Sequence, residues 1–96
     1  MGSARPQTAG LARKLRQIRE GLKLSQASMA HLLRKQDLPV QLKVYPGNVS
    51  RFEQGIREPS VLVLLAYAKA AGVSIEMLVD VRAHLPRHLS GKRRKR

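Results

Sequence analysis

The chain has 96 residues and a formal net charge of +13, with 19 lysines and arginines against six acidic residues. Such a length makes one domain with little room for a deep substrate cavity. The single phenylalanine, two tyrosines and absent tryptophan leave a core of aliphatic side chains. The absence of cysteine excludes disulfides, thiolate metal sites and a thiol nucleophile, and no apolar run approaches the ~20 residues that span a bilayer. We therefore expect a soluble, cytoplasmic protein that neither enters a membrane nor carries a metal or another cofactor.

The positive charge is unevenly distributed along the chain. Residues 1–51 contain ten lysines and arginines but only Glu20 and Asp37, a net charge of +8, whereas residues 52–91 are neutral overall. Residues 92–96 add five consecutive basic residues. An excess of this size predicts a polyanionic partner, and nucleic acid is the natural one. A basic surface that serves only solubility is the alternative, and it fits +13 less well.

The two ends of the chain lack a helical pattern. Residues 1–8 are expected to form a disordered arm, because Pro6 opposes a helix there. Residues 86–96 are expected to form a basic disordered tail that adds sequence-independent phosphate contacts, resembles a nuclear localisation patch, or is simply solvated. Residues 9–85 between them are expected to form a single folded domain.

The segment before residue 35 predicts two helices. In the first, apolar residues recur at helical spacing, at Leu11, Leu15, Ile18 and Leu22. Gly21 suits its end, where a left-handed residue is common. Ser25 is a good N-cap for the second helix, because its hydroxyl accepts a hydrogen bond from a free backbone amide. The inner face of that helix is expected to consist of Met29, Leu32 and Leu33.

Residues 35–47 interrupt the helical pattern. Two prolines bracket three aliphatic residues that alternate with polar ones, Val40, Leu42 and Val44. Alternation is a strand signal, but the stretch is short, and we expect an extended loop that packs these aliphatics on the bundle. The third helix begins between Pro46, which fits a first helical position, and Asn48, which fits an N-cap.

The rest of the chain predicts the remaining helices. Gly55 ends the third helix, and the fourth runs from a cap at Ser60 to Gly72 with Leu64, Leu65 and Ala68 facing inward. Ser74 caps a fifth helix, which covers residues 75–79 and extends to residue 85 at most. Five helices and no credible sheet predict an all-α fold, a compact five-helix bundle.

Two stretches of the chain resemble the helix-turn-helix of the phage Cro and repressor family, the Xre-type regulators. They are Leu24-Ser25-Gln26-Ala27-Ser28-Met29-Ala30 and Val49-Ser50-Arg51-Phe52-Glu53-Gln54-Gly55-Ile56-Arg57-Glu58-Pro59. The resemblance covers roughly residues 11–78, and it implies a lambda-repressor-like bundle whose third helix enters the major groove. The turn of this motif usually has three to four residues. The connection at about residues 35–45 is longer, so the family's positions before Val49 are not carried over safely.

The resemblance, together with outward-facing residues near the motif, gives a set of expected DNA-binding residues. They are Gln26, Lys43, Tyr45, Gly47, Asn48, Ser50, Arg51, Arg57 and Ser60. Gln26 matches a phosphate-binding glutamine, although it also suits an early helical position. Arg51 offers a fork to guanine and Asn48 one to adenine, unless either caps the helix or binds phosphate instead. Arg57 and Ser60 match backbone contacts, and Lys43 adds to them from the inserted loop.

Four further residues match structural positions of the family. Arg19 and Glu53 correspond to an ion pair that ties the first helix to the third. Val49 and Phe52 correspond to the buried side of the recognition helix. We expect these four residues to hold that helix in place rather than to contact DNA.

The resemblance implies a sequence-specific regulator of transcription, a repressor that occupies duplex DNA in the nucleoid as a homodimer. Candidates for the dimer surface are Val79, Val81 and Leu85, which also suit the core of a single chain. One alternative is an antitoxin-like module that binds a small protein partner and regulates its own operon. Another is non-specific nucleic-acid binding, although the few aromatics argue against single strands. The three histidines share no metal spacing with carboxylates, and no residues suggest an enzyme.

Overall fold

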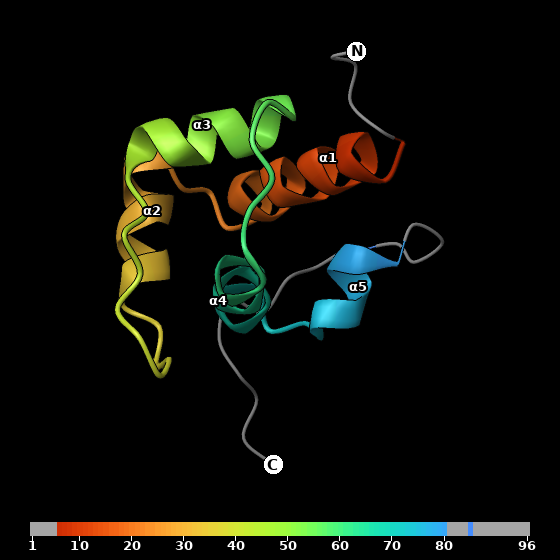
Figure 1. Ribbon diagram of the computed structural model, residues 1–96. Coiled ribbons are helices and arrows are strands. Elements are labelled where there is room, and N and C mark those ends of the chain that lie inside the picture. The colour runs from red at the N-terminus through yellow and green to blue at the C-terminus, as the bar shows by residue number, and fades with distance from the viewer. Residues whose placement is uncertain (1–5, 81–84, 86–96) are drawn as a thin grey trace.

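The computed structural model describes residues 6–80 and residue 85. This part of the chain forms five helices: α1 (Pro6–Gly21), α2 (Gln26–Arg34), α3 (Pro46–Gln54), α4 (Val61–Ala71) and α5 (Ile75–Val79) (Figure 1). No strand occurs among the described residues. The expected all-α fold with five helices is therefore confirmed.

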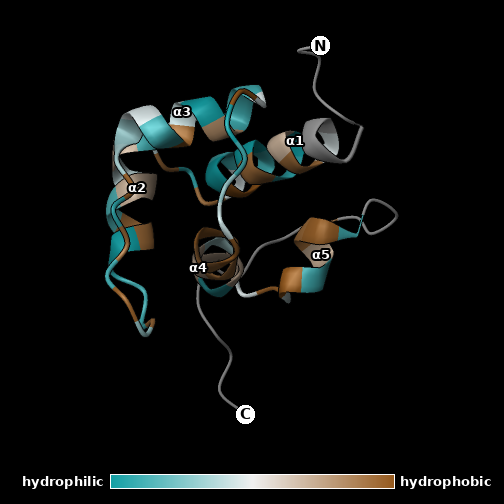
Figure 2. Cartoon of the chain, in the orientation of Figure 1, coloured by the Kyte–Doolittle hydropathy of each residue, from teal (hydrophilic) through white to brown (hydrophobic). Residues whose placement is uncertain are grey.

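Helix α4 forms the centre of the core. Seven of its eleven residues are buried, and Figure 2 shows it as a hydrophobic rod in the middle of the bundle. Helices α1, α2 and α5 each pack against it. Tyr67 is its largest fully buried side chain, and it meets a core that includes Leu15, Ile18, Met29 and Leu33. The apolar stripes expected for the first two helices are thus confirmed at their central positions, whereas Leu32 of α2 is only partly buried. In α4, Leu64 and Ala68 are buried as expected, and Leu65 is only partly buried.

Serine side chains begin two of the helices as expected. The Ser25 hydroxyl accepts from the Ser28 backbone N–H at 3.0 Å, and the Ser60 hydroxyl accepts from the Val63 N–H at 3.3 Å. Each satisfies one of the free amides at a helix N-terminus. Ser74 occupies the N-cap position of α5, but its side chain makes no capping hydrogen bond.

The left-handed residues after α3 and α4 are the expected glycines, whereas the one after α1 is not a glycine. Gly55 and Gly72 adopt left-handed conformations, with φ of 75° and 73°, and stop their helices. Helix α1 ends at Gly21 as expected, but the left-handed residue at this end is Lys23, with φ of 61°. The Leu24 N–H reaches back to the Arg19 carbonyl at 3.1 Å, and this closure places the left-handed bend at Lys23.

Helix α1 begins earlier than the sequence pattern indicates. It starts at Pro6, within the segment expected to be a disordered arm. Proline fits a first helical position because the N–H that it lacks would be unpaired there anyway. Residues 1–5 of that arm and the expected tail at 86–96 lie outside the described residues, as do residues 81–84 after α5.

The connection between α2 and α3 is an ordered loop that covers part of the core. Leu42 and Val44 are buried at 8% and 3% exposure, as expected of the alternating aliphatics. Val40, at 51% exposure, departs from the expectation. It lies in a bend at residues 39–40, before the chain runs back along the bundle toward α3.

Candidate nucleic-acid interface

Helix α3 lies at the edge of the bundle. It packs on α2 and α1, and within the described part of the chain no other helix covers its outer side (Figure 1). Val49 and Phe52 point into the core and are 0% and 5% exposed, as expected. These two side chains fix one side of the helix by apolar burial, so the opposite side is held in a defined orientation.

The outer side of α3 carries three polar side chains and one glycine, which lie one or two helical turns apart: Ser50, Arg51, Gln54 and Gly47. A Cβ atom at Gly47 would lie 3.5 Å from Nη1 of Arg51, so the guanidinium extends back along the helix toward its start. The Ser50 hydroxyl accepts from the Gln54 side-chain amide at 2.7 Å. This face therefore presents a guanidinium, a hydroxyl and an amide and contains no carboxylate.

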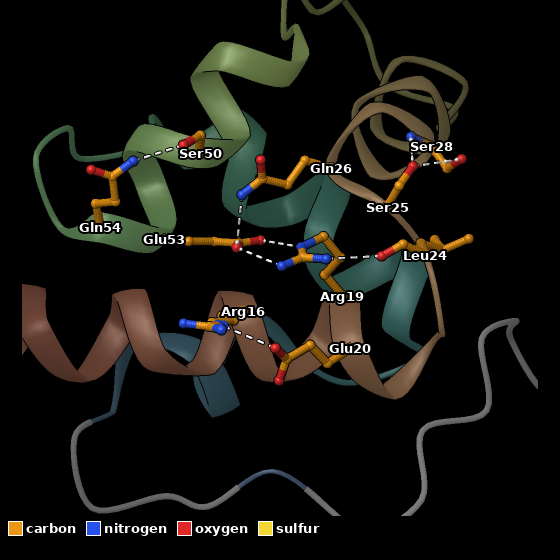
Figure 3. Close-up of polar contacts among 10 residues, drawn as sticks. All are labelled: Arg16, Arg19, Glu20, Leu24, Ser25, Gln26, Ser28, Ser50, Glu53 and Gln54. Carbon is orange, nitrogen blue, oxygen red and sulfur yellow. Dashed lines mark hydrogen bonds and ion pairs between the residues drawn. The ribbon is translucent and has the colours of Figure 1, made fainter.

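A hydrogen-bonded network holds α3 against α1 and α2 (Figure 3). Arg19 of α1 donates from Nε and Nη2 to the two carboxylate oxygens of Glu53, at 2.6 and 3.0 Å. Arg19 also donates to the Leu24 carbonyl at 3.0 Å, and the Gln26 amide donates to Glu53 at 3.3 Å. The hydrogen bond with Glu53 raises the pKa of Arg19 above its ordinary value. The pair ties α1, the α1–α2 turn and α3 together, as the family resemblance implies.

The N-terminus of α3 has its own hydrogen bond. Tyr45 is the N-cap residue and Pro46 the first helical residue, which decides between the two alternatives that the sequence leaves open. Asn48 lies one turn further on, and its Oδ1 accepts from the Tyr45 backbone N–H at 2.8 Å. Half-buried Asn48 thus stabilises the helix start instead of facing fully outward.

The other expected DNA-binding residues lie around α3. Lys43 and Tyr45 are exposed on the connection before it, and Arg57 and Ser60 are exposed beyond its C-terminal end. Gln26, at the start of α2, reaches α3 through Glu53. The structure thus gathers Gly47, Asn48, Ser50 and Arg51 on one helix, with the remaining candidates near its two ends or at the neighbouring α2 terminus.

Two residues of this region, Gln54 and Arg34, are not among those that the sequence predicts for the site. Gln54 follows Gly47 by seven residues and Arg51 by three, a helical spacing that places all three on one face. That signal was present in the sequence. Arg34, at the end of α2, contacts Val44 and Tyr45 across the connection. No sequence signal marks this contact, because it depends on the path of the loop.

Other kinds of site are not apparent in the described part of the chain. None of its helices combines the length and the apolar character that a membrane crossing requires. Among the same residues, no three histidine, cysteine or acidic side chains gather where they could hold a metal ion.

Helices α2 and α3 are short and pack across each other, and α3 has an exposed polar face, as is typical of a helix-turn-helix protein (Figure 1). Residues 10–85 match the family model described as a helix-turn-helix domain, and the chain belongs to this family. No curated protein matches the chain.

Two solved structures are similar to the chain. The P22 c2 repressor protein, solved in complex with the synthetic operator 9T in the presence of Tl⁺, is 25% identical, with a TM-score of 0.61 over 74% of this chain and 94% of its own. The clp gene regulator ClgR from Corynebacterium glutamicum is 23% identical, with a TM-score of 0.64 over 82% of this chain and 74% of its own. The likeness to ClgR supports the fold alone.

Proposed function

We propose that this protein is a transcriptional repressor that binds double-stranded DNA sequence-specifically, with α3 in the major groove. The single observation that carries the proposal is the uncovered polar face of α3, fixed from behind by buried residues and by the Arg19–Glu53 pair. The major groove is about 12 Å wide and admits one α-helix. The membership of the helix-turn-helix family and the operator-bound P22 c2 repressor support the same function.

Base reading is assigned to the outer face of α3. Arg51 is exposed, and its guanidinium matches the O6 and N7 acceptors of guanine. Asn48 is half-buried, and its Oδ1 already accepts from the Tyr45 N–H, which holds the amide at the start of the helix. Gln54 offers the same amide chemistry on an exposed residue, and its Nε2 keeps a second hydrogen beside the bond to Ser50. We therefore assign adenine reading to Gln54 ahead of Asn48.

Contacts with the sugar-phosphate backbone are assigned to residues around α3. Gln26 gives one amide hydrogen to Glu53 and keeps the other for a phosphate oxygen, beside the free N–H groups at the start of α2. Exposed Lys43 and Arg57 add charge before and after α3, and Ser60 adds a hydroxyl. Such contacts position a protein on DNA without reading its sequence.

A homodimer would double the length of the site that is read. Half-sites would then lie about one DNA turn, ~34–36 Å, apart. Exposed Val79 borders a mostly apolar hollow of about 180 Å³, and we assign the dimer contact to this area; its other lining residues are Leu11, Glu58, Pro59, Leu64 and Leu78. Of the other candidates, Leu85 is buried in this chain and Val81 lies outside the described residues.

A variant with Val79→Asp tests the dimer by sedimentation. We expect the wild-type chain to sediment as a dimer at micromolar concentration and the variant as a monomer. A wild-type monomer that nevertheless binds a two-fold symmetric DNA site would refute the assigned surface. Capture of a small protein that displaces the second copy would instead favour an antitoxin-like role.

The function is tested by selecting bound duplexes from a random pool at physiological salt. We expect one enriched motif, with two-fold symmetry where the chain binds as a dimer. Shuffled versions of the enriched duplex serve as controls, and specific binding is typically about 10³-fold or more tighter than non-specific binding. Equal affinity for all duplexes would contradict the proposal and favour a non-specific nucleic-acid-binding protein of the nucleoid.

A further inference from the structure

Arg34 contacts two consecutive residues at the entrance of α3. Its Nη1 donates to the Val44 carbonyl at 2.7 Å. Its guanidinium carbon lies 5.1 Å from the centre of the Tyr45 ring. A guanidinium within about 6 Å of an aromatic centre is attracted to the ring by its quadrupole. One side chain of α2 therefore holds both the backbone and the ring that precede α3.

This contact addresses a problem that the long connection creates. A turn of three to four residues sets the position of the next helix by its own geometry. Residues 35–45 are too many for that, and each additional loop residue adds conformations that must be restricted. Buried Leu42 and Val44 anchor the loop to the core, and Arg34 then fixes the last peptide before Tyr45.

The Tyr45 ring is held but not buried. Tyr45 is 54% exposed. Its backbone N–H donates to Asn48, and its ring contacts Arg34. An exposed aromatic ring that is already restrained by a neighbouring side chain loses less freedom on binding a partner. Its hydroxyl is a donor of the kind that binds phosphate oxygens in protein–DNA complexes.

We propose that Arg34 is a positioning residue, which holds Tyr45 so that its hydroxyl donates to a DNA phosphate at the N-terminal end of α3. This proposal rests on the proposed function and adds a new part to it. Arg34 acts through the Tyr45 ring and not through a contact of its own charge with DNA. A lysine at this position keeps the charge but lacks the planar group that spans the carbonyl and the ring.

The test is a double-mutant cycle on the selected duplex, with Arg34→Lys, Tyr45→Phe and the double variant. Tyr45→Phe keeps the ring and removes the phosphate donor, so affinity falls about tenfold. Arg34→Lys lowers affinity about threefold when Tyr45 is present and has no effect in the Tyr45→Phe background. Because neither change alters the net charge, the salt dependence stays the same.

The matched control is Lys35→Arg, a charge-conserving change at an exposed position next to Arg34, which should leave affinity unchanged. Thermal unfolding of each variant separates a loss of folding from a loss of contact. A structural role alone would weaken binding equally with Tyr45 and with phenylalanine. That outcome, or no weakening in either background, would overturn the proposal.

A measurement on the free protein distinguishes the two proposals. The Tyr45 ring should shift the side-chain proton resonances of Arg34, and Tyr45→Leu should abolish the shift. If the Arg34 resonances are shifted but no duplex is enriched from the random pool, the proposed function is overturned, and the DNA role of Arg34 with it. A selected duplex without coupling in the cycle would overturn only the positioning role, and an absent shift would refute the contact itself.

Discussion

Helices α3 and α4 have similar lengths and opposite surroundings. Helix α4 buries seven of its eleven residues and is surrounded by its neighbours, whereas α3 buries Val49 and Phe52 among nine. Burial of apolar surface is what stabilises the fold, so α4 contributes mainly to stability. The side chains on the outer side of α3 contribute little to the stability of the fold. Stability therefore does not constrain their identity, and they can match a binding partner. The comparison predicts that changes on α4 alter stability and changes on the outer face of α3 alter binding.

The largest effect is expected where the inner side of α3 meets α1. Glu53→Gln leaves Arg19 without its partner in a mostly buried position, with side chains 15% and 5% exposed in the pair. Removing one member of such a pair costs about 3–5 kcal/mol of unfolding free energy. Urea denaturation measures this loss, and α3 should lose its DNA affinity in parallel.

Glu20→Gln is the matched control for that change. Glu20 pairs with Arg16 at 2.9 Å on the surface of α1, where both side chains are more than half exposed. An exposed pair contributes at most about 1 kcal/mol, so the control should cost far less than Glu53→Gln. Equal losses in the two variants would show that the Arg19–Glu53 pair does not anchor α3.

The outer face of α3 should show the reverse behaviour. Arg51→Ala is expected to leave the unfolding free energy within about 0.5 kcal/mol of the wild type. It should reduce discrimination at one base pair of the selected site by about 1–3 kcal/mol. Arg57→Ala, its counterpart in the loop, should weaken all sequences alike and lower the salt slope by about one. Identical behaviour of the two variants would contradict the separation of base reading from backbone contact.

A smaller effect on stability is expected at the centre of α4. The Tyr67 hydroxyl is buried and has no hydrogen-bond partner among the described residues. Burial, and to a lesser extent the Glu53 charge, raises the pKa of Tyr67 well above its ordinary value of 10.0. Tyr67→Phe should therefore keep the unfolding free energy or raise it by about 1 kcal/mol.

The same substitution predicts a difference in pH dependence. Below pH 10 the phenol is protonated in both the folded and the unfolded chain. Above it the unfolded chain loses this proton while the folded chain keeps it, so the stability of the wild type falls as pH rises. Tyr67→Phe removes this part of the alkaline loss. Parallel stability curves for the two proteins above pH 10 would argue against a buried phenol.

The smallest effect is expected at the end of α1. Lys23→Gly places the residue with the least steric cost in a left-handed conformation, and it should raise stability by about 0.5–1 kcal/mol. Gly72→Ala makes the opposite change after α4 and should lower stability by about 1 kcal/mol. Chemical denaturation of both variants checks the signs, and a loss of stability in Lys23→Gly would be inconsistent with the left-handed bend.

Local features of the fold were predictable from the sequence. The capping serines at 25 and 60 and the terminal glycines at 55 and 72 act through their nearest neighbours. Helical spacing alone identified the buried sides of α1 and α2, whereas the buried side of α3 followed from the family resemblance. The Arg19–Glu53 pair required the family resemblance, because its members lie 34 positions apart.

The remaining features depend on where distant segments meet. The left-handed residue after α1 is set by the bond from Leu24 to Arg19, which overrides the preference for Gly21. The hydrogen-bond partners of Gln26 and Asn48 depend on which side-chain conformation each residue adopts, and residue spacing in the sequence does not determine this. The contact of Arg34 with Tyr45 exists only because the loop returns to the end of α2. Sequence therefore predicts the helix that presents the site more readily than the hydrogen bonds within it.

The most direct test of the central claim is methylation protection on the selected duplex. Guanine N7 lies in the major groove, whereas adenine N3 lies in the minor groove. The account predicts that the bound protein protects N7 and leaves N3 open, and that Arg51→Ala restores methylation at one guanine in each half-site. Protection of N3 with N7 fully reactive would contradict the placement of α3 in the major groove.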